Sequence, residues 1–212
     1  EGLVNYMIQT GPRINEIAPK KTVLEKFLKL YGESDAKIEY QLIGESTERI
    51  MNAKEKYELT KWAEEKHPDL KFRFEKDLGV LEGREVVGKI HKGVVEIAEG
   101  KAPIDVIPHE VSHNVVDVLE VFGDARSKRL IKEGIDLFAK EVTPEQAYKD
   151  FVAKRGEEVG ITKTSQMTKE HKERAMYEAK KEKLVDAVGK HATGRVLNKS
   201  LLFKLKSWTK GT

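Results

Sequence analysis

The sequence predicts an α+β protein, with a mixed sheet and helices in an N-terminal part, residues 1–104, and helices alone over residues 105–188. Two observations predict this division. Segments that alternate apolar and polar residues, as half-buried strands do, all lie before residue 100. Beyond it, apolar residues recur every three or four positions, which is the period of an amphipathic helix. We therefore expect one domain over residues 1–188, followed by a basic C-terminal tail over residues 189–212.

The N-terminal part is expected to contain short strands and two helices. Pro68 ends the second of these helices, and turn-forming glycines at 79 and 83 precede a β-hairpin. The expected helices are Thr22–Leu30 and Ser46–Lys66. The expected strands are Leu3–Ile8, Ala36–Ile43, Leu70–Phe74, Glu85–Ile90 and Val94–Ala98, of which the last two form the hairpin.

A helix is then expected to begin after Asp105 and to end at Gly123. Asp105 can cap its first turn, and Pro108 is tolerated there because a missing N–H costs little at that position. Glycine is a common residue at a helix stop. The apolar residues form one stripe opposite His109 and His113, so we expect the histidines to face a cleft or water. The stripe comprises Ile107, Val111, Val115, Val118, Leu119 and Phe122.

This helix carries the sequence His109-Glu110-Val111-Ser112-His113, which has the pattern His-Glu-x-x-His. On a helix the two imidazoles lie one turn apart and can bind one Zn²⁺, while the glutamate can take a proton from a metal-bound water. We therefore expect His109 and His113 to be zinc ligands and Glu110 to be the general base. The alternative is a pair of solvated surface histidines.

A catalytic zinc site of this kind needs a third protein ligand, and the next predicted helix, Arg126–Val142, offers Glu133. Glu133 points away from the buried side of that helix. Its helical neighbours are nevertheless Leu130 and Leu137, which predicts a second, partly buried contact face. Asp136, within a turn of Glu133, is the alternative ligand.

Together, His109-Glu110-x-x-His113, the nineteen residues before Glu133 and the step Glu133-Gly134-Ile135 resemble the gluzincin branch of the zincin metallopeptidases, which includes thermolysin. The resemblance covers about thirty residues of the chain. It implies a zincin-like fold with the motif on an active-site helix, and a metal site completed by a glutamate from the next helix. The metzincin branch is excluded, because Val116 and Leu119 stand where that branch requires Gly and His or Asp.

The gluzincin resemblance also implies an acidic residue four positions after the ligand glutamate, hydrogen-bonded to a ligand histidine. Leu137 stands at that position after Glu133, so Asp117 and Asp136 are the candidates for this orienting role. The chemistry further needs a donor that stabilises the oxyanion. The candidates for this donor are Tyr148, His171, Tyr177 and His191.

These residues predict a zinc-dependent metallopeptidase that binds one Zn²⁺ per chain and hydrolyses peptide bonds in a peptide or protein substrate. An exposed edge of the hairpin before the motif helix is expected to pair with an extended substrate. Two alternatives are a catalytically silent protein of zincin-like fold with a structural or interaction role, and a helical nucleic-acid-binding protein in which the motif is accidental.

Composition limits the remaining classes of function. The 212 residues include no cysteine, which excludes disulfides and cysteine-ligated metals, and 35% are charged, as expected for a soluble protein. No apolar run is long enough to span a bilayer, and the first ten residues lack the features of a signal peptide. Because the chain begins with Glu1, we expect it to be a fragment or a processed part of a longer chain, such as a polyprotein.

The expected tail differs from the rest of the chain in charge. Residues 189–212 contain six basic residues and no Asp or Glu, against a net charge of +3 for the whole chain. With Phe203 and Trp208 among them, these residues suggest contact with nucleic acid or with an anionic surface.

Overall fold

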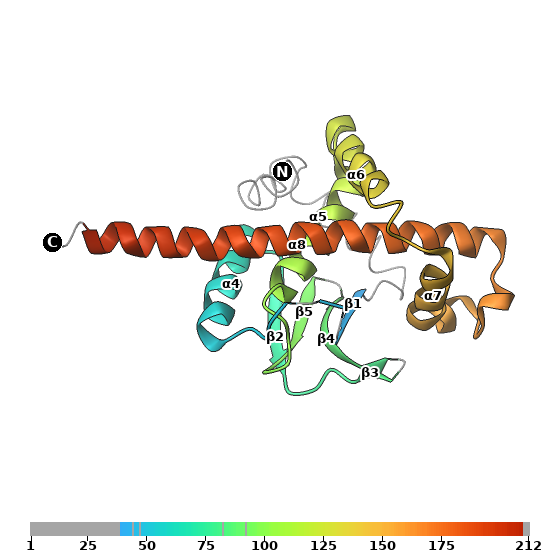
Figure 1. Ribbon diagram of the computed structural model, residues 1–212, viewed down its shortest axis with the longest axis horizontal. Coiled ribbons are helices and arrows are strands. Elements are labelled where there is room, and N and C mark those ends of the chain that lie inside the picture. Colours follow the sequence, from blue (N-terminus) through green and yellow to red (C-terminus); the bar gives the residue numbers. More distant parts are fainter. Residues whose placement is uncertain (1–38, 44, 47, 82, 92, 210–212) are drawn as a thin grey trace.

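A computed structural model describes residues 39–43, 45–46, 48–81, 83–91 and 93–209 of the 212-residue chain (Figure 1). Within these residues the protein is α+β, as predicted, with a five-stranded mixed sheet among helices. The strand expected at residues 3–8 and the helix expected at residues 22–30 lie outside the described residues.

The sheet has the strand order β1-β4-β5-β2, and β3 pairs with β4. β4 and β5 form the predicted antiparallel hairpin, with Gly88 opposite Ile97, and β2 pairs with β5 in parallel. A positive φ of 75° at Gly93 allows the tight turn between the hairpin strands. The strands are β1 (Glu39–Leu42), β2 (Lys71–Glu75), β3 (Val80–Leu81), β4 (Arg84–His91) and β5 (Val94–Ala98).

The hairpin is interior to the sheet, so the prediction of an exposed hairpin edge for substrate is wrong. β1 pairs along β4, and β2 pairs along β5. The backbone groups that an extended peptide would use are therefore already in ladder hydrogen bonds with neighbouring strands.

Helix α4 (Ala53–Lys66) begins later than the predicted start at residue 46. Asn52 caps it, because its side-chain oxygen accepts hydrogen bonds from two first-turn backbone N–H groups at 3.0 Å each. The described residues just before it, 48–52, form no helix, and Ile50 makes a β-bridge with Pro103. This bridge ties the segment before α4 to the loop that leads into α5.

The C-terminal part is helical, as predicted. Asp105 does not cap α5 with its side chain, because its carboxylate accepts hydrogen bonds from Ser46 Oγ at 2.9 Å instead. Among the described helices, none has both the length and the apolar character that a membrane span requires. The helices are α5 (Val106–Phe122), α6 (Ala125–Leu137), α7 (Pro144–Val159) and α8 (Lys169–Thr209), with a 3₁₀ turn at Thr164–Gln166.

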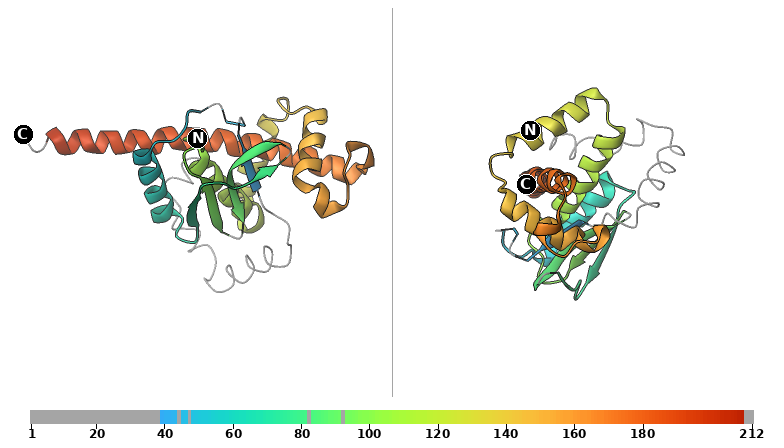
Figure 2. Two further views of the ribbon diagram at one scale, coloured as in Figure 1. Left: turned by 90° about the horizontal axis from the view of Figure 1, so that it is seen from below. Right: turned by 90° about the vertical axis from the view of Figure 1, so that its right-hand side faces the viewer.

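Helix α8 is a long rod that crosses the whole molecule and extends beyond it (Figures 1 and 2). It continues through Gly189, where the sequence predicted the end of the domain and the start of a tail. Ala192 and Val196 are buried in the main core. The first part of the expected tail therefore belongs to the folded body.

The main core lies between the sheet, α4, α5, α6 and α8, and it buries α5 on nearly every side. All residues from Val106 to His113 are buried, including both histidines. The sequence predicted a histidine side facing a cleft or water. This side packs against α8 and both histidines are buried, although His113 also lines a cavity. A smaller apolar cluster joins α7 to the start of α8 and comprises Phe151, Ile161, Met167 and Ala175.

Candidate metal centre

The two histidines of α5 face two carboxylates of α8. His109 and His113 lie one turn apart on α5, and Glu182 and Asp186 lie one turn apart on α8. Gly189 lets the two helices approach closely, because a Cβ at this position would lie 2.9 Å from the Cα of His109. The close approach places the carboxylates within reach of both imidazoles.

Three side chains converge at this crossing. The Nε2 atoms of His109 and His113 are 3.1 Å apart, and one carboxylate oxygen of Glu182 lies 3.3 Å from the first and the other 3.4 Å from the second. The side chains of the histidines are 1% and 4% exposed, and that of Glu182 is 26% exposed. One ligand atom from each residue lies within 4.8 Å of the others, so the trio can hold a metal ion.

The spacing and chemistry of these atoms fit zinc. Zn–N and Zn–O bonds of about 2.0–2.1 Å place two ligands of a tetrahedron about 3.3–3.4 Å apart. The Nε2–Nε2 separation of 3.1 Å is close to that value, and each Glu182 oxygen lies 3.3–3.4 Å from a different imidazole. Two imidazoles and one carboxylate are also a common ligand set of catalytic zinc sites, which keep a fourth position for water.

Asp186 lies beside His109. Its Oδ1 is 3.0 Å from Nδ1 of the imidazole, which is within ion-pair distance. The charge of this carboxylate favours a proton on the imidazole. Asp186 follows Glu182 by four positions along α8.

Burial and neighbouring charges act in opposite directions on the pKa values of this site. Burial lowers the pKa of His109, but hydrogen bonds to Asp186 and Glu182 outweigh it and hold the pKa well above its ordinary value. Burial raises the pKa of Glu182, but the charges of His113 and Lys154 outweigh it and hold the pKa well below its ordinary value. Glu182 is thus ionised, and His109 holds a proton that a metal cation would replace.

Glu110 is fully buried between α5 and β4. A Cβ at Gly88 of β4 would lie 2.7 Å from Oε1 of Glu110 and 2.6 Å from Cγ2 of Val106, so glycine leaves the space that the carboxylate fills. The charge of Glu110 also contributes to raising the pKa of His109. Keeping a carboxylate in the interior is costly, and this one follows His109, a candidate metal ligand, directly in the sequence.

The other carboxylates predicted from the sequence lie elsewhere. Glu133 is 56% exposed and forms an ion pair of 2.7 Å with an arginine on the same helix. Asp136 is exposed on α6, and Asp117 is buried in an ion pair with Lys181 of α8. The structure brings Glu182 to the histidines in place of Glu133, because α8 and not α6 packs across the histidine side of α5.

A cavity of about 540 Å³ lies between α7 and α8 beside the candidate site. His113, Glu182 and Asp186 line it, together with Lys154 of α7. The Nζ of Lys154 lies 3.1 Å from the backbone oxygen of Tyr40, and its charge contributes to lowering the pKa of Glu182. A cavity of this size can accept several side chains of a peptide.

Of the four oxyanion-donor candidates, Tyr177 lines this cavity. Its hydroxyl is hydrogen-bonded to Glu120 of α5. Tyr148 lines a different cavity, His171 packs beside the core of α7, and His191 is exposed on α8. The structure therefore leaves Tyr177 as the candidate nearest to the metal ligands along α8.

Comparisons with protein-family models, with curated proteins and with solved structures give no match to this chain.

Gly189→Ala is expected to weaken metal binding by separating α5 from α8. The added Cβ would lie 2.9 Å from Cα and 3.0 Å from N of His109, and these backbone atoms yield only if the helices shift. We expect the zinc Kd to rise about 10-fold or more and the free energy of unfolding to fall by about 1–3 kcal/mol. Calorimetric zinc titration and denaturant unfolding measure the two effects.

Gly194→Ala is the matched control, because it lies on the same helix and its Cβ would have nothing within 4 Å. It should leave zinc affinity unchanged and raise the free energy of unfolding by up to about 1 kcal/mol. Equal zinc affinity in the two variants would contradict the role assigned to the close helix contact.

Proposed function

We propose that this protein is a zinc-dependent metallopeptidase in which His109, His113 and Glu182 bind the zinc and Glu110 is the general base. The observation that carries the proposal is the convergence of the two Nε2 atoms and the Glu182 carboxylate at 3.1–3.4 Å. The support of His109 by Asp186 at 3.0 Å strengthens it. Glu182 and Asp186 have the spacing that the gluzincin resemblance implies for a ligand glutamate and its acidic partner.

The ligand set favours zinc over Mg²⁺ or Ca²⁺. Those ions prefer ligand sets made up of oxygen atoms, whereas two of the three ligand atoms here are imidazole nitrogens. Imidazole suits zinc and other first-row transition metals. Three protein ligands also leave room for a water at the fourth position of a tetrahedral ion.

The chemistry that zinc supplies when bound is polarisation of the peptide carbonyl and a water pKa lowered to about 7. Glu110 would accept the proton of that water and pass it to the leaving amine. Lys154 lines the substrate cavity and would donate a hydrogen bond to the carbonyl oxygen as it becomes negative, whereas the Tyr177 hydroxyl already donates its proton to Glu120.

Zinc removal tests the proposal. Purified protein is expected to contain one zinc per chain and to cleave at least one member of a fluorogenic peptide library. Treatment with a chelator should abolish cleavage, added zinc should restore it, and added Mg²⁺ should not. Cleavage that persists in fully metal-free protein would refute the proposal. Stoichiometric zinc with no cleavage of any peptide would favour the catalytically silent alternative.

A further inference from the structure

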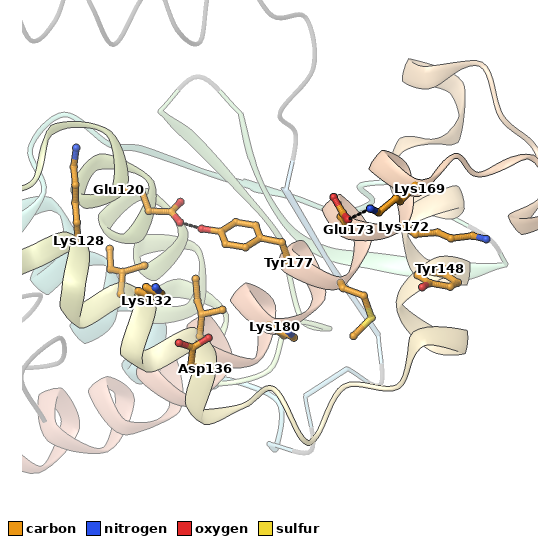
Figure 3. Close-up of a pocket in the computed structure, with 13 residues that line it drawn as sticks. Glu120, Lys128, Lys132, Asp136, Tyr148, Lys169, Lys172, Glu173, Tyr177 and Lys180 are labelled. Carbon is orange, nitrogen blue, oxygen red and sulfur yellow. Dashed lines mark hydrogen bonds and ion pairs between the residues drawn. The ribbon is translucent and has the colours of Figure 1, made fainter.

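A second cavity, of about 860 Å³, lies between α6, α7 and α8 and shares Tyr177 with the metal-site cavity. Figure 3 shows Lys128 and Lys132 on α6 at one side and Lys169 and Lys172 at the other, with Tyr177 reaching toward Glu120 between them. None of the three metal-ligand candidates lines this cavity.

The rim of the second cavity is positively charged. Glu173 offsets Lys169 at 3.8 Å, and Glu120 is bound by Lys181 at 2.6 Å, so neither carboxylate is available to the other lysines. Asp136 is the remaining acidic residue of the lining. Within the described part of the chain, no ion pair involves the four other lysines of the lining, which are Lys128, Lys132, Lys172 and Lys180.

The floor of the cavity is apolar. Ile131 and Ile135 of α6, which are 2% and 5% exposed, line it together with Met176 and Tyr177 of α8. A ligand that fills this cavity can therefore bury apolar side chains on the floor while it places negative charges at the rim. Because lysines lie at both sides of the cavity, they can pair with negative charges at several positions along an extended ligand.

We propose that this cavity binds an acidic segment of the polypeptide substrate, in which carboxylates alternate with apolar side chains. The inference rests on the proposed function only in assigning the segment to a substrate. Tyr177 borders both cavities, so the second cavity lies next to the one that the candidate metal ligands line.

An acidic peptide fits this cavity better than a nucleic acid does. Proteins that bind single-stranded nucleic acid combine a positive groove with aromatic rings on which bases stack. Here Tyr177 is tied to Glu120, and Lys172 lies over the ring of Tyr148 at 5.9 Å. The lining also contains no arginine, the residue best suited to bidentate phosphate contacts. Buried isoleucines on the floor offer nothing to a phosphate backbone.

Binding is tested by fluorescence anisotropy on the full chain carrying Glu110→Gln, which should not cleave the probe. The probe is a labelled peptide of alternating Glu and Leu residues, compared with a Gln-for-Glu peptide and a Ser-for-Leu peptide. We expect the first to bind about 10-fold more tightly than either counterpart at low salt. The advantage over the Gln peptide should vanish at 1 M salt, where the screening length is about 3 Å.

Charge reversal locates the site. Lys128→Glu with Lys132→Glu should weaken binding of the acidic peptide about 10-fold or more. Lys54→Glu with Lys61→Glu is the matched control on α4, because both lysines are exposed and neither lines either of these two cavities. Thermal unfolding checks that all four substitutions leave the fold intact. Equal affinity for the Glu and Gln peptides, or equal weakening by both double variants, would overturn the inference.

Two further outcomes separate this inference from the proposed function. Tighter binding of a single-stranded oligonucleotide than of the acidic peptide, lost in the Lys128/Lys132 variant, would overturn the inference in favour of a nucleic-acid site. Acidic-peptide binding lost in that variant, with no cleavage of any peptide by the natural chain, would refute the peptidase and support the binding site. Cleavage by the natural chain without any preference for acidic substrates would support the peptidase and overturn the inference of an acidic-peptide site.

Discussion

We expect Glu182→Ala to lose zinc almost completely. The substitution removes one of three ligands and leaves two imidazoles whose Nε2 atoms are 3.1 Å apart, an arrangement that binds zinc weakly without an anionic partner. The zinc Kd should rise by more than the 10- to 100-fold that follows loss of an orienting partner. Calorimetric titration measures the affinity, and metal analysis of the purified protein measures the occupancy.

Glu133→Ala is the matched control for Glu182→Ala, since both substitutions truncate a glutamate on a C-terminal helix. Glu133 is exposed and forms an ion pair within α6, so its truncation should leave zinc affinity unchanged and cost at most about 1 kcal/mol of stability. If Glu133→Ala lost zinc while Glu182→Ala kept it, the assignment of the third ligand would be reversed.

Glu110→Gln should keep zinc and lose cleavage. The amide nearly matches the carboxylate in size, so it can occupy the space beside Gly88 without displacing β4. It cannot act as a general base, a role that typically contributes 10²–10⁴-fold to the rate. We expect kcat to fall by about that factor, with zinc content still at one per chain.

A carboxylate that lines the metal-site cavity provides the comparison for Glu110→Gln. Asp150 of α7 lines the metal-site cavity and accepts a hydrogen bond from Gln146 at 2.8 Å. Asp150→Asn should change kcat far less than Glu110→Gln does, because Asp150 is not one of the proposed metal ligands. Full activity of the Glu110→Gln variant would exclude Glu110 as the general base, whatever the zinc content of the variant.

The motif helix could be predicted from the sequence because its signals are local. Pro108 and Gly123 mark its two ends, and the apolar stripe sets its orientation. What covers the histidine side could not be predicted this way. That side is buried by α8, which is packed there through Gly189, a contact between residues eighty positions apart.

Glu182 was missed for a similar reason. It lies sixty-nine positions after His113, among Lys180, Lys181 and Lys183, and such alternating charge usually marks a solvated face. A weak signal was present. Glu182 and Asp186 are four residues apart and enclose Leu184 and Val185, both buried, as expected for carboxylates at the margin of a buried face. That pattern is too common to identify a ligand alone.

The hairpin illustrates a second limit of sequence patterns. Both strands were predicted nearly to their bounds from alternation and the glycine between them. Strand order is not encoded by alternation, so the parallel pairing of β2 on β5 could not be anticipated. That pairing makes the expected substrate edge interior.

Helix α8 carries Lys172 of the second cavity and Glu182 of the metal-site cavity, so it would fix the distance along its axis between the two cavities for a substrate that spans both. Lys172 and Glu182 are ten residues apart, or about 15 Å at the α-helical rise of about 1.5 Å per residue. An extended peptide covers that length with about four to five residues at roughly 3.3 Å each. The scissile bond would then be chosen by its distance in residues from an acidic patch, even where the residues flanking that bond vary.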